Sequence, residues 1–273
     1  MTAALETPEA PASPRAHHLP AALTVLVAVA LLGAGPELLG DSGRLIAVGV
    51  LQLALVGSWV VGTVPGGAAG TALIGVAAAV GADLAMELPT RPTLGGLLGA
   101  IGPAFLALVL NQMLRRQRGE VVAALSGGVL LVCAVSALST ALLVGRPDPG
   151  TGLMALLAVG AALLAGHVVD LVLPWPRLAP GVPRGLLGLV LAVVVAAAAA
   201  FVGRGAGGLV GGLSAVTFGA LLGAVAALVA VAGSYVTAEA EATGRRALAL
   251  AVAQGLLPIA ACAPVALALQ TAL

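Results

Sequence analysis

LLGLVLAVVVAAAAAFV, residues 186–202, is a run of seventeen residues without a charged or polar side chain. Its length is close to the roughly 20 apolar residues that an α-helix needs to cross the hydrocarbon core of a bilayer. A transmembrane β-strand would alternate apolar and polar residues over about ten positions, and this run does not alternate. In lipid, a helix satisfies its backbone hydrogen bonds within one segment. The stretch therefore predicts a transmembrane helix.

Similar runs recur along the whole chain. Of its 273 residues, 60% are hydrophobic and only 8% are charged, whereas a soluble domain carries about 25% charged residues. Too little charge is present to cover a water-exposed surface, so the sequence predicts an all-α fold, a polytopic transmembrane helix bundle of about nine spans. The runs are residues 19–35, 45–64, 68–88, 93–114, 121–144, 153–173, 186–202, 209–236 and 247–273.

The polar start of the chain predicts a second kind of segment. Residues 1–18 are rich in proline and polar side chains, which predicts a disordered cytoplasmic tail, and residues 19–273 are expected to form a single transmembrane domain. Pro36 is expected to end the first span. Glycines four apart, such as Gly95/Gly99 and Gly219/Gly223, predict close helix packing, because small residues let helix backbones approach in lipid.

Arginine placement predicts the orientation, because short basic loops stay in the cytoplasm. With nine spans, eight arginines fall on the side of the N-terminus and four on the other. The eight are Arg15, Arg115, Arg116, Arg118, Arg177, Arg184, Arg245 and Arg246, and the four are Arg44, Arg91, Arg146 and Arg204. The N-terminus is therefore predicted in the cytoplasm and the C-terminus outside.

Composition also predicts the compartment and the partners. All twelve basic residues are Arg, and Ala, Val, Leu and Gly dominate, a bias typical of Ala-rich membrane proteins of actinobacteria, so we expect a bacterial plasma membrane. The lipid bilayer is the expected partner, with a second membrane protein as a further candidate. A net charge of +1 gives no field that would attract nucleic acid.

Charged side chains inside spans are costly, so they are the first functional candidates. His167 and Asp170 lie three residues apart on one face of the sixth span. They are the candidate catalytic residues, as a proton relay in which Asp170 stabilises the imidazolium. The alternative is that the two side chains satisfy each other at headgroup depth.

Other polar residues are expected at the same depth. Together they predict a cavity that faces the cytoplasm around His167 and Asp170. The candidate binding residues are Asn111, Gln112, Tyr235 and Gln254.

A second acidic pair lies in the third span, near its outer end. Asp83 and Glu87 are four residues apart on one face, where they would hold a cation or share a proton. The alternative is that Glu87 lies in the interface. Gln52 is expected to hydrogen-bond between helices, and Glu37 is expected to be solvated.

No metal ligands or cofactor motif stand out in the sequence. Cys133 and Cys262 both lie in apolar runs and do not form a CxxC pair, which predicts buried small side chains. We therefore expect neither a metal site nor a cofactor.

The loop PWPRLAPGVPR, residues 174–184, carries a resemblance. With Asp170 before it and GLLG after it, it resembles the region of bacterial phosphatidate cytidylyltransferases where an Asp-bearing span leads through a cytoplasmic loop into a glycine-containing helix. The similarity covers residues 153–236. That family's Ser-Pro-Lys-Lys-Thr, Gly-Asp-Leu-x-x-Ser and C-terminal acidic motifs are missing, and only Asp170 maps onto it. The resemblance therefore implies a related fold rather than the activity.

Three functions fit these observations. The sequence favours a non-enzymatic component of the cell envelope, because no catalytic motif and no large extramembrane segment stand out. A small-solute transporter is the first alternative, because ionisable residues and prolines interrupt the spans. A lipid-modifying enzyme with its site at His167 and Asp170 is the second alternative, and it rests on the resemblance.

Overall fold

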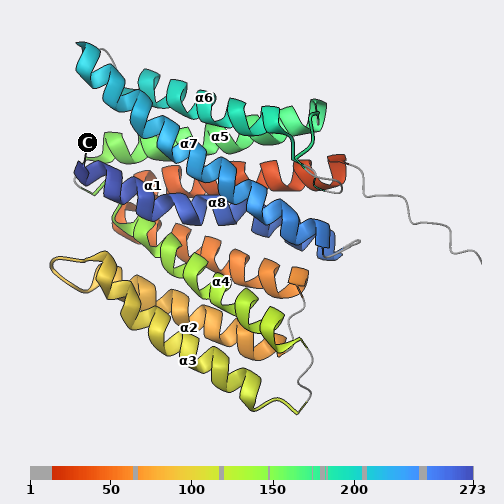
Figure 1. The fold of residues 1–273 in the computed structure, drawn as a ribbon. Coiled ribbons are helices and arrows are strands. Elements are labelled where there is room, and N and C mark those ends of the chain that lie inside the picture. Colours follow the sequence, from red (N-terminus) through yellow and green to blue (C-terminus); the bar gives the residue numbers. More distant parts are fainter. Residues whose placement is uncertain are drawn as a thin grey trace, which may run out of the picture.

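A computed structural model describes most of the chain, namely residues 14–63, 67–116, 120–146, 148–173, 175–178, 182, 184–204, 208–239 and 245–272. In these residues the fold is all-α, as predicted, and eight helices are long and apolar enough to cross a membrane. The helices lie side by side along one common direction (Figure 1). The elements are α1 (Pro14–Thr63), α2 (Ala68–Glu87), η1 (Leu94–Leu97), α3 (Leu98–Met113), α4 (Val121–Ser139), η2 (Thr140–Leu142), α5 (Pro149–Val172), α6 (Leu186–Arg204), α7 (Gly208–Glu239) and α8 (Arg245–Ala272).

Helix α1 consists of two halves, before and after Gly40, that fold back on each other. Gly40 has φ 62° and ψ −144°, a conformation that is essentially restricted to glycine. A Cβ atom on Gly43 would overlap the carbonyl oxygen of Gly35, although eight residues of straight helix span about 12 Å. The first two apolar runs therefore meet at Gly40. The prediction that Pro36 ends the first run is wrong, because Pro36 lies inside the first half.

The conformation of this turn predicts that position 40 must be glycine, which can be tested. Replacing Gly40 by alanine is expected to lower the free energy of unfolding by about 1–3 kcal/mol, the cost of such a backbone conformation for a residue with a Cβ atom. The matched control is Gly49→Ala in the second half of α1, where a Cβ atom would meet nothing within 4 Å. Thermal unfolding in one detergent would compare the two variants. Equal stabilities would mean that the turn does not need glycine.

Helix α8 lies at the centre of the bundle. It packs against both halves of α1 and against α4, α5 and α7. Its Gly255 meets Ala21 in the first half of α1, and its Leu250 meets Gly62 in the second half. The first half of α1 groups with α5, α6 and α7, and the second half groups with α2, α3 and α4 (Figure 1).

The chain runs alternately between two ends of this bundle (Figure 1). The histidine end holds the start of α1 with His17 and His18, together with the connections α1–α2, α3–α4, α5–α6 and α7–α8. The Gly40 end holds the turn of α1, the connections α2–α3, α4–α5 and α6–α7, and the end of α8. Every connection therefore lies at one end or the other.

The helical region starts earlier than the sequence predicted. Helix α1 begins at Pro14, where the missing N–H of proline is tolerated in a first helical turn. His18, assigned to the tail, is buried in the bundle. The boundary of the helical region is therefore Pro14 rather than residue 19. Residues 1–13 of the predicted tail and Leu273 lie outside the described residues.

One of the predicted glycine contacts is present. A Cβ atom on Gly223 of α7 would lie 2.6 Å from the Cβ of Ala196 in α6, so these helices touch along their backbones. Gly99 differs, because a Cβ atom there would meet nothing within 4 Å. The Gly95/Gly99 pair therefore does not mark a helix contact at Gly99.

Candidate functional site

The histidine end contains a buried polar group that we call the histidine–arginine cluster: His17, His18, His167, Asp170 and Arg184. α1 supplies the first two residues, α5 supplies His167 and Asp170, and Arg184 lies two residues before α6. Four of the five side chains are at most 3% exposed, and His17 is partly buried. The cluster thus joins three segments of the chain.

A buried ion pair forms one half of the cluster. Arg184 Nη1 lies 3.5 Å from Asp170 Oδ2, and the backbone N–H of Gly185 donates to Asp170 Oδ1 at 2.9 Å. Burial lowers the pKa of the Arg184 guanidinium, and the Asp170 carboxylate acts in the opposite direction. The guanidinium and the carboxylate are therefore each other's counter-charge in a buried site.

The proline-rich loop is what brings Arg184 into the bundle. Arg177 and Gly185 form an antiparallel bridge, and the N–H of Leu186 donates to the carbonyl of Pro176 at 3.0 Å. These bonds close the loop at its base, so the residue before Gly185 points between α5 and α6. Arg177 itself is exposed, with its guanidinium 5.6 Å from the ring centroid of Trp175.

Two glycines leave space for the ion pair. A Cβ atom on Gly188 of α6 would overlap Asp170 Oδ1, and one on Gly166 of α5 would lie 3.0 Å from Arg184 Nη1. Real Cβ atoms do not approach other atoms as closely as the contact at Gly188, so the pair requires glycine at that position. At Gly166 a Cβ atom would only require the end of the Arg184 side chain to shift slightly.

The histidines form the other half of the cluster. Arg184 Nη2 lies 3.1 Å from His167 Nε2, and His167 Nδ1 lies 3.2 Å from His18 Nδ1. Arg184 Nη2 also lies 3.4 Å from His167 Nδ1. A guanidinium only donates hydrogen bonds, so the His167 nitrogen that bonds to Arg184 accepts. If that nitrogen is Nε2, the closer of the two, the proton of a neutral imidazole is on Nδ1 and faces His18. This chain of bonds is suited to passing a proton between two imidazoles.

The sequence predicted a direct contact between His167 and Asp170, and the structure has a different arrangement. Arg184 contacts both side chains and lies between them. His17 packs edge-on against His18, with ring centroids 5.2 Å apart. Asp170 therefore balances a guanidinium rather than an imidazolium.

The other residues predicted near this site separate into two groups. Gln254 of α8 is buried beside His17 and donates to the carbonyl of Gly233 at 2.9 Å. Asn111 lies against Gly70 of α2, because a Cβ atom on Gly70 would overlap its amide. The predicted cavity therefore does not include the end of α3, which packs on α2 and α4.

Gln112 and Tyr235 have different surroundings. Gln112 is buried and accepts a hydrogen bond from Arg115 at 2.8 Å, at the same end of α3 as Asn111. Tyr235 is 43% exposed on α7. Of the four candidate binding residues, Gln254 is the one for which the structure describes a contact with the histidines.

The acidic pair of α2 has separate partners. Gln52 donates to Asp83 Oδ1 at 2.9 Å and also contacts Ser139 Oγ at 2.9 Å, which fits its predicted interhelical role. Glu87 forms an ion pair of 2.5 Å with Arg146. Asp83 therefore bonds to α1, whereas Glu87 pairs with the connection between α4 and α5.

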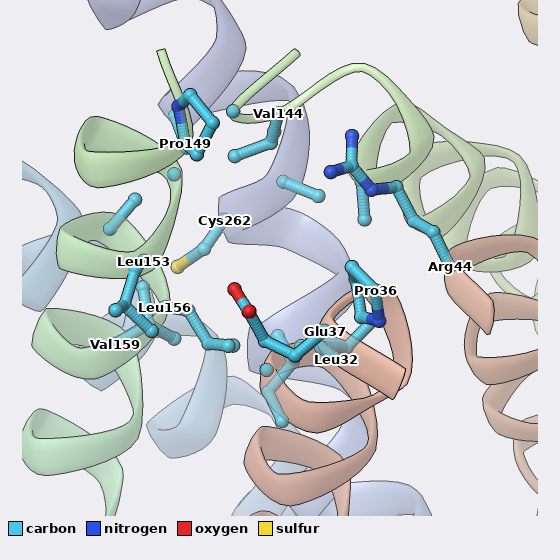
Figure 2. Close-up of a pocket in the computed structure, with 18 residues that line it drawn as sticks. Leu32, Pro36, Glu37, Arg44, Val144, Pro149, Leu153, Leu156, Val159 and Cys262 are labelled. Carbon is cyan, nitrogen blue, oxygen red and sulfur yellow. The ribbon is translucent and has the colours of Figure 1, made fainter. Parts of the chain in front are cut away.

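A pocket lies at the Gly40 end, between the first half of α1, α5 and α8. We call this cavity of about 120 Å³ the Glu37 pocket. Figure 2 shows the Glu37 carboxylate extending into it, across from Leu153 and Leu156 of α5, with Cys262 of α8 alongside. Glu37 and Arg44 are the charged residues in the lining, which is otherwise mostly apolar.

A polar hollow, which we call the vestibule, adjoins this pocket. It shares Arg44, Gly145 and Pro149 with the pocket, and its other lining residues are Asp41, Glu87 and Arg146. Arg44 Nη1 donates to the carbonyl of Leu142 at 3.3 Å. Glu37 is exposed, which agrees with the expectation that it is solvated, and its carboxylate also faces this cavity.

Several of these residues escaped sequence reasoning. His17 and His18 were assigned to the tail, although Pro14 is a helix-start signal and a histidine pair beside an apolar run is a signal of its own. Arg184 was counted as a loop cation, whereas a buried Asp170 requires a nearby positive partner. Glu37 is recognised as a pocket residue only in the folded structure, where α5 and α8 lie beside it.

No group of three or more His, Cys, Asp or Glu side chains is placed to hold a metal ion within the described part of the chain. The cluster's own chemistry is instead that of hydrogen bonds and charge. We compared the chain with protein-family models, with curated proteins and with solved structures, and none of them matches it.

Proposed function

We propose that the protein is a multi-pass membrane protein with nine spans, in which each half of α1 crosses separately. A straight helix of 50 residues would measure about 75 Å, whereas the hydrocarbon core is about 30 Å thick. The turn at Gly40 divides α1 into two lengths that suit the bilayer. The alternation of connections between the two ends supports the same count (Figure 1).

We further propose that the histidine end faces the cytoplasm of a bacterial cell. Eight of the twelve arginines belong to this end in the nine-span arrangement, against four at the Gly40 end. Arg184 is neutralised by Asp170, and Arg146 by Glu87, so one arginine is discounted on each side. Seven against three still favours the histidine end.

For function, we propose a carrier of a small solute. The observation that supports it is that two polar sites lie at opposite ends of one seam, formed by the first half of α1, α5 and α8. The Glu37 pocket is open at one end, and the histidine–arginine cluster is closed at the other. Buried apolar residues fill the seam between them, including Val25, Ala162 and Leu256. This is the arrangement expected of a carrier open to one side.

Helix α8 has the features of a moving part in such a carrier. Pro258 and Pro264 each lack an N–H, so the carbonyls of Gln254 and Ala260 lose their helical partner. Gln254 adjoins the histidines, and the residues between the prolines include Cys262 in the pocket lining. Interrupted helices at the substrate path recur in secondary transporters. A bend of α8 would therefore act on both sites.

Uptake into proteoliposomes tests this function. The purified chain would be reconstituted and offered small cations, neutral amphiphiles and anions, with and without an imposed pH gradient. We expect saturable, gradient-dependent accumulation of one class. His167→Gln, which retains an acceptor for Arg184, should remove the effect of the gradient, while Tyr235→Phe, exposed at the same end, should leave it unchanged.

Two results together would contradict the carrier function. If monodisperse protein accumulates none of the classes, and a second membrane protein copurifies with it in fixed stoichiometry from mild detergent, the carrier function is wrong. The non-enzymatic envelope role would then replace it.

A further inference from the structure

We propose that the Glu37 pocket binds a small organic cation with a compact apolar body. This inference names the substrate class for the carrier proposed above, and in that respect it rests on the proposed function. The binding site itself is argued from three properties of the pocket, which are its charge, its lining and its size.

The charge of the site is not balanced by its own residues. In the vestibule Arg146 pairs with Glu87, and the guanidinium of Arg44 donates to the carbonyl of Leu142. Glu37 is not in contact with a described cation within 4 Å, although Arg44 lines the same pocket. Counting pocket and vestibule together, three carboxylates (Glu37, Asp41, Glu87) face two guanidiniums, which leaves one negative charge. A monocation is the complementary ligand.

The lining distinguishes an organic cation from a metal ion. Leu153, Leu156 and Val159 line the side of the pocket that the Glu37 carboxylate faces, and Leu32 lines it from α1 (Figure 2). Calcium takes six to eight oxygen ligands and magnesium retains several waters, and these side chains supply no oxygen. An ammonium group that carries hydrocarbon would instead pair with Glu37 and bury its apolar part against the leucines.

The volume of the pocket limits the size of the apolar part of the ligand. A cavity of about 120 Å³ is slightly smaller than the roughly 150 Å³ apolar cavity that holds benzene in another protein. One ring or a short branched alkyl group therefore fills the apolar part. Larger groups would have to extend into the vestibule, past Arg44 and Gly145.

Direct binding tests the proposal without transport. Benzylamine, benzyl alcohol and benzoate would be titrated by calorimetry into the full chain in nanodiscs, with empty nanodiscs as the blank. We expect benzylamine to bind about tenfold more tightly than benzyl alcohol, a difference of about 1.4 kcal/mol, and benzoate more weakly than either. Equal affinities for the amine and the alcohol would overturn the proposal.

Variants then locate the site. Glu37→Gln should weaken benzylamine about tenfold and leave benzyl alcohol unchanged, whereas Leu156→Trp should weaken both by filling the cavity. Glu120→Gln, the same change on an exposed residue at the histidine end, should alter neither. An unchanged thermal unfolding curve for Glu37→Gln would show that the variant folds. Wild-type affinity in Glu37→Gln or in Leu156→Trp would contradict the assignment.

The two proposals fail in different ways. Benzylamine binding that needs Glu37 but is accompanied by no uptake of any solute would sustain this inference and remove the carrier function. Uptake of another solute class by protein that does not bind benzylamine would sustain the carrier function and remove this inference.

Discussion

Asp170→Asn is expected to lower the free energy of unfolding by about 3–5 kcal/mol, because it leaves the Arg184 guanidinium buried without a counter-charge. The substitution keeps the shape of the side chain, so the space left by Gly188 still fits it. Asp170 is fully buried and Arg184 is 3% exposed, so water cannot replace the lost carboxylate. Chemical unfolding in one detergent would measure the change.

A double variant separates the charge from the packing. Asp170→Asn with Arg184→Met removes both charges and keeps a long apolar side chain, so it should be more stable than Asp170→Asn alone. The matched control is the ion pair of Glu87 and Arg146, whose side chains are 30% and 33% exposed. Breaking it with Glu87→Gln should cost at most about 1 kcal/mol. If the two changes in the buried pair simply add, Asp170 and Arg184 are not coupled.

The sequence predicted most of the fold because lipid imposes one solution on a long apolar run. Outside α1, each helix, counted together with the 3₁₀ turn η1 or η2 where one adjoins it, begins and ends within four residues of its predicted run. The turn of α1 lies at Gly40, within the predicted gap between residues 35 and 45, but the first half of the helix continues past Pro36, because proline is tolerated inside membrane helices when neighbouring groups compensate. Gly40 adopts a conformation that no local pattern specifies, and its partners Gly35 and Gly43 meet only after the chain has turned.

The site was predictable only where one helix holds two members. His167 and Asp170 share a face of α5, and helical spacing alone predicts that. Arg184 reaches Asp170 through the bridge between Arg177 and Gly185, and such loop geometry is not encoded in periodicity. Glu37 and Cys262 meet at one pocket although more than two hundred residues separate them in the sequence. Contacts between distant helices are set by tertiary packing, which an individual apolar run does not specify.

Cysteine labelling should give an all-or-none result on the orientation. The background is a chain with Cys133→Ala and Cys262→Ala, into which Arg91→Cys, Arg116→Cys or Arg177→Cys is introduced. All three arginines are exposed, Arg91 at the Gly40 end and the other two at the histidine end. Asp148 is a poorer probe of the Gly40 end than Arg91, because it caps α5 by accepting from the N–H groups of Gly150 and Thr151.

In intact cells, a membrane-impermeant maleimide should label Arg91→Cys and leave Arg116→Cys and Arg177→Cys unlabelled until the cells are permeabilised. The reason is that short basic loops are retained in the cytoplasm, and Arg115 to Arg118 form the most basic short loop of the chain. The experiment also bears on the number of spans. If α1 crossed the membrane once instead of twice, every later connection would exchange sides, and Arg116→Cys would be labelled first. Such a reversed pattern would refute the cytoplasmic location of the histidine end beyond α1, whether α1 crosses once or the whole nine-span bundle is inverted.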